Sequence, residues 1–125
     1  MGKRRARIGA ALWGGFLFLL TSWPNPPSVP AGGIPLDKVT HLLLYAVEAF
    51  LLYRAIAWKG RPGFAWSRIL ILIGTMAAWG ALDEAHQEWV PGRMMDSADF
   101  FADVAGATVG AFLAAAMARE GRPQN

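Results

Sequence analysis

The chain has 125 residues, no cysteine, and a composition that is 54% hydrophobic and only 17% charged. This composition is too apolar for an ordinary small soluble domain, and a chain of this length is expected to form one domain. The absence of cysteine excludes disulfides and thiolate-based metal or catalytic sites. The net charge is +3, but the basic residues flank apolar runs, which favours membrane topology over nucleic-acid binding.

The first apolar run covers residues 8–23 and follows the basic segment 3–7. It predicts a membrane helix, somewhat short against the roughly 20 residues that a bilayer core requires. A cleaved signal peptide is the alternative, because Val29-Pro30-Ala31 offers a small-residue cleavage point. Trp13 and the long proline-bearing gap argue against cleavage.

Three further spans are predicted over residues 37–58, 67–88 and 97–118. Residues 24–35 contain five prolines and two glycines, which exclude a helix and indicate a connector. Pro91-Gly92 ends the third span, and Asp96 or Ser97 can cap the fourth. The sequence therefore predicts an all-α polytopic membrane protein, a bundle of four transmembrane helices in a single domain, 1–125.

Charge predicts how this bundle is oriented. Ten of the twelve basic residues fall on one side, namely Lys3, Arg4, Arg5, Arg7, Arg54, Lys59, Arg61, Arg68, Arg119 and Arg122. Lys38 and Arg93 fall on the other side. The excess of basic residues on cytoplasmic loops places both termini in the cytoplasm. Seven of the nine acidic residues gather at the outer side: Asp37, Asp83, Glu84, Glu88, Asp96, Asp99 and Asp103.

Helical spacing indicates which polar side chains meet. On the second span, residues three, four or seven apart share one stripe: Asp37, His41, Tyr45 and Glu48. Asp83 and Gln87 share a face of the third span. On the fourth, Asp99 and Asp103 lie beside small residues that recur every four positions: Ala102, Gly106, Gly110 and Ala114. Such a repeat lets a neighbouring helix approach closely, so we expect these carboxylates to point into the bundle.

The same residues form an ordered set of motifs: Asp37-Lys38-x-x-His41, Asp83-Glu84-x-x-Gln87, Pro91-Gly92-Arg93 and Asp96-x-x-Asp99-x-x-x-Asp103-x-x-Gly106. This set resembles the pattern of VanZ-like membrane proteins. The resemblance implies a small four-span protein whose founding relative is linked to low-level teicoplanin resistance, and it implies no known reaction. Asp103 stands where many relatives carry an amide such as Asn, which adds a negative charge here.

The candidate ligand-binding residues are Asp37, Lys38, His41, Asp83, Glu84, Gln87, Arg93, Asp99 and Asp103, with Tyr45 and Glu48 as deeper polar groups. Each has a structural alternative. His41 with Asp37 is either a proton relay or metal pair, or a histidine bonded to a neighbouring helix. The carboxylates either hold a divalent cation or form salt bridges with Lys38 and Arg93. No cofactor is required by the sequence, and a divalent cation is the one candidate.

Three classes of function remain open. The first, which we favour, is a non-catalytic protein whose acidic outer mouth binds or excludes an envelope ligand, such as a lipid-linked wall precursor or a glycopeptide. The second is a membrane enzyme that uses the carboxylates, His41 and Mg²⁺ on a phosphorylated lipid. The third is a proton or cation transporter, for which Glu48 is the one deep ionisable residue. The expected surroundings are the lipid bilayer, with the chain as a monomer or homodimer.

Overall fold

Four α-helices and no strand make up the regular structure in the computed structural model, which describes residues 1–26, 36–56 and 65–120. The helices are α1 (Lys3–Thr21), α2 (Leu36–Ala55), α3 (Ala65–Gln87) and α4 (Ser97–Glu120). The all-α prediction is therefore confirmed. The connector predicted over residues 24–35 lies mostly outside the described residues, as does the end of the predicted second span after Ile56.

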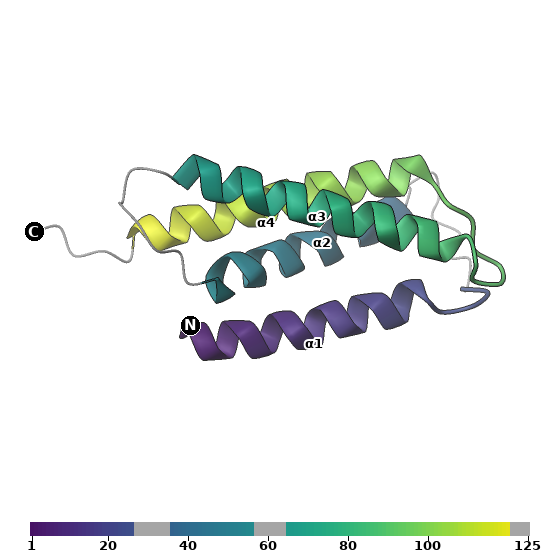
Figure 1. Cartoon of the computed structure of the whole chain (residues 1–125), viewed down its shortest axis with the longest axis horizontal. Coiled ribbons are helices and arrows are strands. Elements are labelled where there is room, and N and C mark those ends of the chain that lie inside the picture. Colours follow the sequence, from purple (N-terminus) through teal and green to yellow (C-terminus); the bar gives the residue numbers. More distant parts are fainter. Residues whose placement is uncertain (27–35, 57–64, 121–125) are drawn as a thin grey trace, which may run out of the picture.

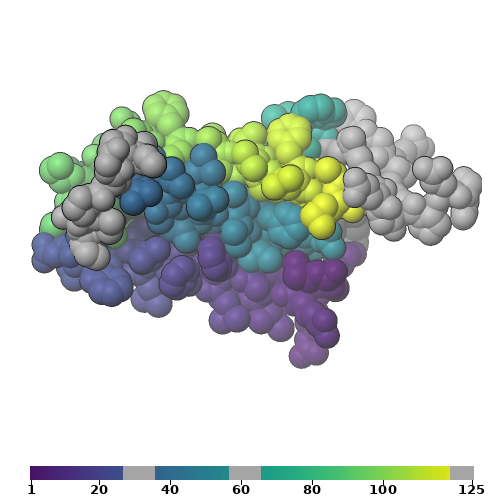
Figure 2. Space-filling view, turned by 180° about the vertical axis from the view of Figure 1, so that it is seen from behind, coloured from purple at the N-terminus to yellow at the C-terminus, as the bar shows by residue number. Residues whose placement is uncertain are grey.

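The four helices run along the long axis of the molecule, and α2 lies at their centre (Figure 1). It contacts α1, α3 and α4, whereas α1 packs on α2 with only marginal contact to α3. Viewed from behind, α1 and α4 flank α2 on opposite sides (Figure 2). The bundle is therefore a tight group of α2, α3 and α4 with α1 laid against one side.

Two glycines of α4 make the α2–α4 crossing unusually close. A Cβ atom added to Gly106 would lie 2.0 Å from the carbonyl oxygen of Leu42, and one added to Gly110 would lie 2.0 Å from that of Ala46. Only hydrogen fits at either position. Ala114 continues this face and is fully buried, while Ala102 is half-buried. The small-residue repeat therefore lets the two backbones touch, as expected for helices that associate through small residues.

The helix α1 begins at Lys3, so the basic segment before the first apolar run is itself helical. Two side chains fasten α1 to backbone carbonyls of α2. Trp13 Nε1 donates to the Leu44 carbonyl at 2.9 Å, and Arg7 Nε donates to the Ala55 carbonyl at 3.2 Å. The carbonyl of Ala55 belongs to the last turn of α2, where helical partners run out. These bonds fix how α1 lies along the bundle.

The packed core is small and the outer faces are apolar. Tyr45, Leu17, Leu72 and Met76 are among the largest side chains that are fully buried. Large apolar side chains stand exposed on every helix, including Leu12, Leu19, Leu43, Leu70, Leu82 and Phe101. Among the described residues, one helical segment, Ser97–Ala118, is long and apolar enough to cross a membrane. The four predicted spans are therefore four helices, of which one meets that measure.

Candidate functional site

One end of the bundle gathers most of its buried polar side chains. At this end α1 and α3 stop and α2 and α4 start, so the last turns of two helices meet the first turns of two others. The buried polar residues there, which we call the polar cluster, are Thr21, His41, Asp83, Glu84, Gln87, Asp99 and Asp103. All four helices contribute. Asp99 and Asp103 of α4, which the small-residue repeat predicted to point into the bundle, are buried there together with Asp83 and Glu84 of α3.

Lys38 forms the cationic rim of the polar cluster. Its ammonium nitrogen lies 2.9 Å from Asp37 Oδ2 and 2.7 Å from Asp99 Oδ1, and it also pairs closely with Asp96. Asp96 in turn caps α4, because its Oδ1 accepts the backbone N–H of Ala98 at 2.8 Å. The hydrogen bond from Lys38 and, after it, the Ala98 N–H lower the pKa of Asp96 below its ordinary value. Lys38 therefore joins the starts of α2 and α4.

Below the rim, His41 is held between two carboxylates of α4. Its Nδ1 lies 2.9 Å from Asp103 Oδ1, and its Nε2 lies 3.9 Å from Asp99 Oδ2. Asp103 is fully buried, and its second oxygen, Oδ2, has no hydrogen-bond partner among the described residues. The carboxylate of Asp103 thus orients the imidazole and directs Nε2 towards Asp99.

Asp83 is on α3, and its carboxylate bonds to side chains of both α1 and α2. Its Oδ1 accepts the hydroxyl of Thr21 at 2.8 Å, and its Oδ2 accepts the hydroxyl of Tyr45 at 3.3 Å. Gly80, one turn earlier on α3, leaves room beside this site, since a Cβ there would lie 3.1 Å from Asp103 Oδ2 and 3.5 Å from Tyr45 Cε1. Two hydroxyls therefore satisfy Asp83 without a positive charge.

Glu84 connects the end of α3 to the start of α4. Its Oε2 accepts the backbone N–H of Asp96 at 2.8 Å, and its Oε1 lies 3.4 Å from the side-chain nitrogen of Gln87. Both residues are almost fully buried. The motif Asp83-Glu84-x-x-Gln87 thus puts Glu84 and Gln87 side by side and sends Asp83 toward α1 and α2.

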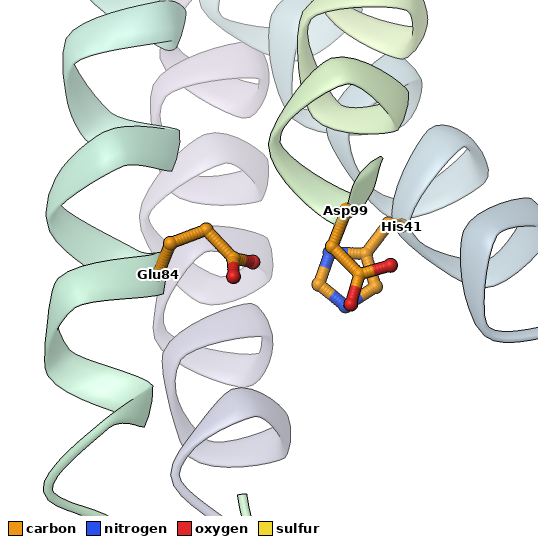
Figure 3. A group of neighbouring side chains, drawn as sticks. All are labelled: His41, Glu84 and Asp99. Carbon is orange, nitrogen blue, oxygen red and sulfur yellow. The ribbon is translucent and has the colours of Figure 1, made fainter. Parts of the chain in front are cut away.

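Three of these groups have the arrangement of metal ligands. One ligand atom each from His41, Glu84 and Asp99 lies within 4.8 Å of the others. Figure 3 shows the three side chains, from α2, α3 and α4, turned towards a common space. A nitrogen and two carboxylate oxygens suit a divalent cation, and a histidine ligand held by a carboxylate at its other nitrogen is the usual support for such a site. Asp37, Asp96 and Asp99 form a second, more exposed group of this kind.

Two predicted site residues lie elsewhere. Arg93 Nη2 donates to the Leu20 carbonyl at 2.8 Å and Arg93 Nε to the Trp23 carbonyl at 3.2 Å. The guanidinium therefore closes the end of α1, where the sequence had suggested pairing with the carboxylates. Glu48 lies beside α1 against Gly14, about 16 Å from Asp37 by helical rise.

The hydroxyl of Thr21 belongs to the polar cluster, although no motif includes it. Its one signal in the sequence is position, because it is a hydroxyl residue in the last turn before Pro24, at the depth of the acidic groups. Asp96 was expected as a cap, and its ion pair with Lys38 adds it to the site.

A family model described as VanZ/LLP1 matches residues 8–118 of this chain. The chain belongs to the VanZ/LLP1 family. The resemblance that the sequence motifs indicated is thereby confirmed, and VanZ membership links the chain to glycopeptide resistance at the level of the family. Neither a curated protein nor a solved structure matches it significantly. The VanZ-like motifs of this chain come together in the fold, because their acidic, histidine and amide residues make up most of the polar cluster.

Proposed function

We propose that this VanZ/LLP1 protein is a four-span protein of a bacterial inner membrane that binds an envelope ligand at the polar cluster and thereby modulates tolerance to teicoplanin. Exposed apolar side chains on all four helices support the membrane setting, because a soluble protein rarely leaves so much apolar surface in water. The basic residues at the opposite end favour an outward-facing polar cluster.

The observation that carries the proposal is an imbalance of charge in the polar cluster. Four carboxylates are buried there, from Asp83, Glu84, Asp99 and Asp103. The nearby basic groups are Lys38 and His41. Buried negative charge is costly unless it is paired. A ligand that brings an ammonium group or several hydrogen-bond donors would supply the missing partners, and so would a phosphate bound through a divalent cation.

The membrane topology can be tested because the chain lacks cysteine. A single cysteine replacing Met94, which is 83% exposed beside the polar cluster, should react with a membrane-impermeant maleimide in intact cells. A cysteine replacing Lys3 at the opposite end should react only after the cells are opened. Labelling of both in intact cells, or of neither, contradicts the proposed orientation.

The function is tested by the substitution Asp99→Asn in a host whose teicoplanin tolerance depends on the chain. Asp99 contacts both Lys38 and His41, so we expect tolerance to fall to the level of a strain without the gene, at unchanged protein level. Glu88→Gln is the matched control, because it removes one negative charge from an exposed residue at the same end. Full tolerance in Asp99→Asn cells contradicts the proposal.

A second function, a metal-dependent enzyme acting on a phosphorylated lipid, is favoured by the His41, Glu84 and Asp99 group with its supporting Asp103. A divalent cation held there would polarise a phosphate oxygen. Purified protein should then release phosphate from a lipid phosphate, with loss of turnover on chelation and in Asp103→Asn. Binding of the lipid without turnover at any divalent cation supports the non-catalytic function instead.

A further inference from the structure

A groove lies between α1, α2 and α3, and none of the residues of the polar cluster lines it. Its volume is about 490 Å³, within the range of cavities that hold drug-sized molecules. The residues that form its walls are mostly small or apolar and include Ala11, Gly15, Leu52, Met76 and Trp79. It exists because α1 packs on α2 and barely touches α3.

The carboxyl group of Glu48 lines this groove. Glu48 is only 8% exposed, and its Oε2 has no hydrogen-bond partner among the described residues. Gly14 leaves the space that the group occupies, since a Cβ there would lie 3.2 Å from Glu48 Oε1. The nearest basic residue in the walls is Arg7, which lies about 10 Å from Gly14 by helical rise and already donates Nε to the Ala55 carbonyl.

The groove is open along one side. Ala11 and Gly15 on α1 are exposed, as are Thr75 and Trp79 on α3. This step rests on the proposed function, in which all four helices span the membrane. The open side of the groove then faces the acyl chains, and an amphiphile can enter it from the bilayer. Any occupant must present hydrocarbon to the walls and a hydrogen-bond donor to one buried acidic group.

We propose that this groove is a binding site for a lipophilic primary amine, whose ammonium group pairs with Glu48 and whose aliphatic chain lies against α1 and α3. Charge complementarity selects this occupant. A carboxylate without a partner in an apolar wall gains most from a cation that brings its own hydrocarbon, because the chain replaces apolar contacts while the ammonium meets the charge. An alcohol of equal chain length makes the same apolar contacts with the walls but brings no positive charge to Glu48.

The test uses a dodecylamine brominated along its chain, which quenches tryptophan fluorescence, and the full chain in lipid nanodiscs. Trp79 lines the groove, so the native protein should show a saturable component of quenching that is absent in Trp79→Phe, which keeps the other five of the six tryptophans. Brominated dodecanol is the uncharged comparison. The substitution Glu48→Gln should weaken binding of the amine about tenfold, equivalent to ~1.4 kcal/mol, and leave binding of the alcohol unchanged.

A steric variant tests the site without touching Glu48. A Cβ at Gly15 meets nothing within 4 Å, so Gly15→Leu should fold normally and block both amphiphiles by filling the groove. Gly74→Leu is its matched control, because Gly74 on α3 is equally unobstructed and is not part of the walls. Equal binding of the amine by the native protein and Glu48→Gln overturns the proposal. Retention of the amine by Gly15→Leu also overturns it. So does a nanodisc that contains two copies of the native chain and binds no amine, because a second copy would then cover the groove.

Discussion

The substitution Gly106→Ala should loosen the α2–α4 crossing and disturb the polar cluster together. The added Cβ would lie 2.0 Å from the Leu42 carbonyl oxygen, whereas real Cβ atoms essentially never come within 3.0 Å of such a neighbour. The neighbour is backbone, so no side chain can turn aside. The two helices must separate by about 1 Å, and overpacking of this kind costs about 1–3 kcal/mol.

The same displacement reaches the site, because His41 precedes Leu42 on α2 and Asp103 lies one turn before Gly106 on α4. The 2.9 Å contact between His41 and Asp103 should lengthen. We therefore expect Gly106→Ala to lower the unfolding midpoint in mixed detergent and to reduce tolerance to teicoplanin along with it. Imidazole NMR chemical shifts of His41 measure the change at the site directly.

Gly74→Ala is the control for this substitution. Gly74 also lies within a helix, but a Cβ there meets nothing within 4 Å. Alanine should be neutral or stabilise the helix by up to ~1 kcal/mol. If Gly106→Ala and Gly74→Ala have the same unfolding midpoint, the inference that backbone contact at Gly106 sets the helix spacing is wrong.

Three further predictions concern the polar cluster and its surroundings. Thr21→Val removes the hydroxyl donor from Asp83 and should cost about 1–3 kcal/mol of unfolding free energy; an unchanged midpoint in detergent contradicts a role for this bond. Arg93→Gln should weaken the end of α1 by about 1 kcal/mol and speed hydrogen exchange in its last turn, while exchange in α3 stays constant. Asp96→Asn keeps a capping side chain but loses the charge paired with Lys38. Because the folded pKa of Asp96 is lowered, its charge stabilises the protein above the unfolded pKa of about 3.9, and this stability is lost as the pH falls through the folded pKa. The native protein should therefore have a higher unfolding midpoint than Asp96→Asn at pH 7, and this difference should shrink as the pH falls below the unfolded pKa.

Helix number and order followed from local features of the sequence. Apolar runs separated by prolines and glycines predicted four helices, and three of the predicted starts lie within two residues of the observed ones. The exception is α1, which begins five residues before its apolar run. Lysine, arginine and alanine, which make up residues 3–7, have high helix propensity although the charged side chains prefer water. Helical periodicity also put His41 with Glu48, and Asp99 with Asp103, on inward faces.

Pairing between helices could not be read from the same patterns. Arg93 had carboxylates as its expected partners, but the chain after α3 turns so that the Arg93 guanidinium donates to the backbone carbonyls of Leu20 and Trp23 at the end of α1. Thr21 and Asp83 are 62 residues apart, and nothing in either local sequence predicts their contact.

The sequence by itself determined which residues are apolar, which face of each helix is polar, and which family the chain belongs to, because these depend on residue types at fixed helical spacing. Only the tertiary structure decided which carboxylate meets which donor, and that α1 stands off α3 to leave Glu48 in a groove. Those outcomes depend on how closely helices approach. Closeness is set by atoms that meet across the bundle, such as the hydrogen of Gly106 against the backbone of α2, and not by neighbours along the chain.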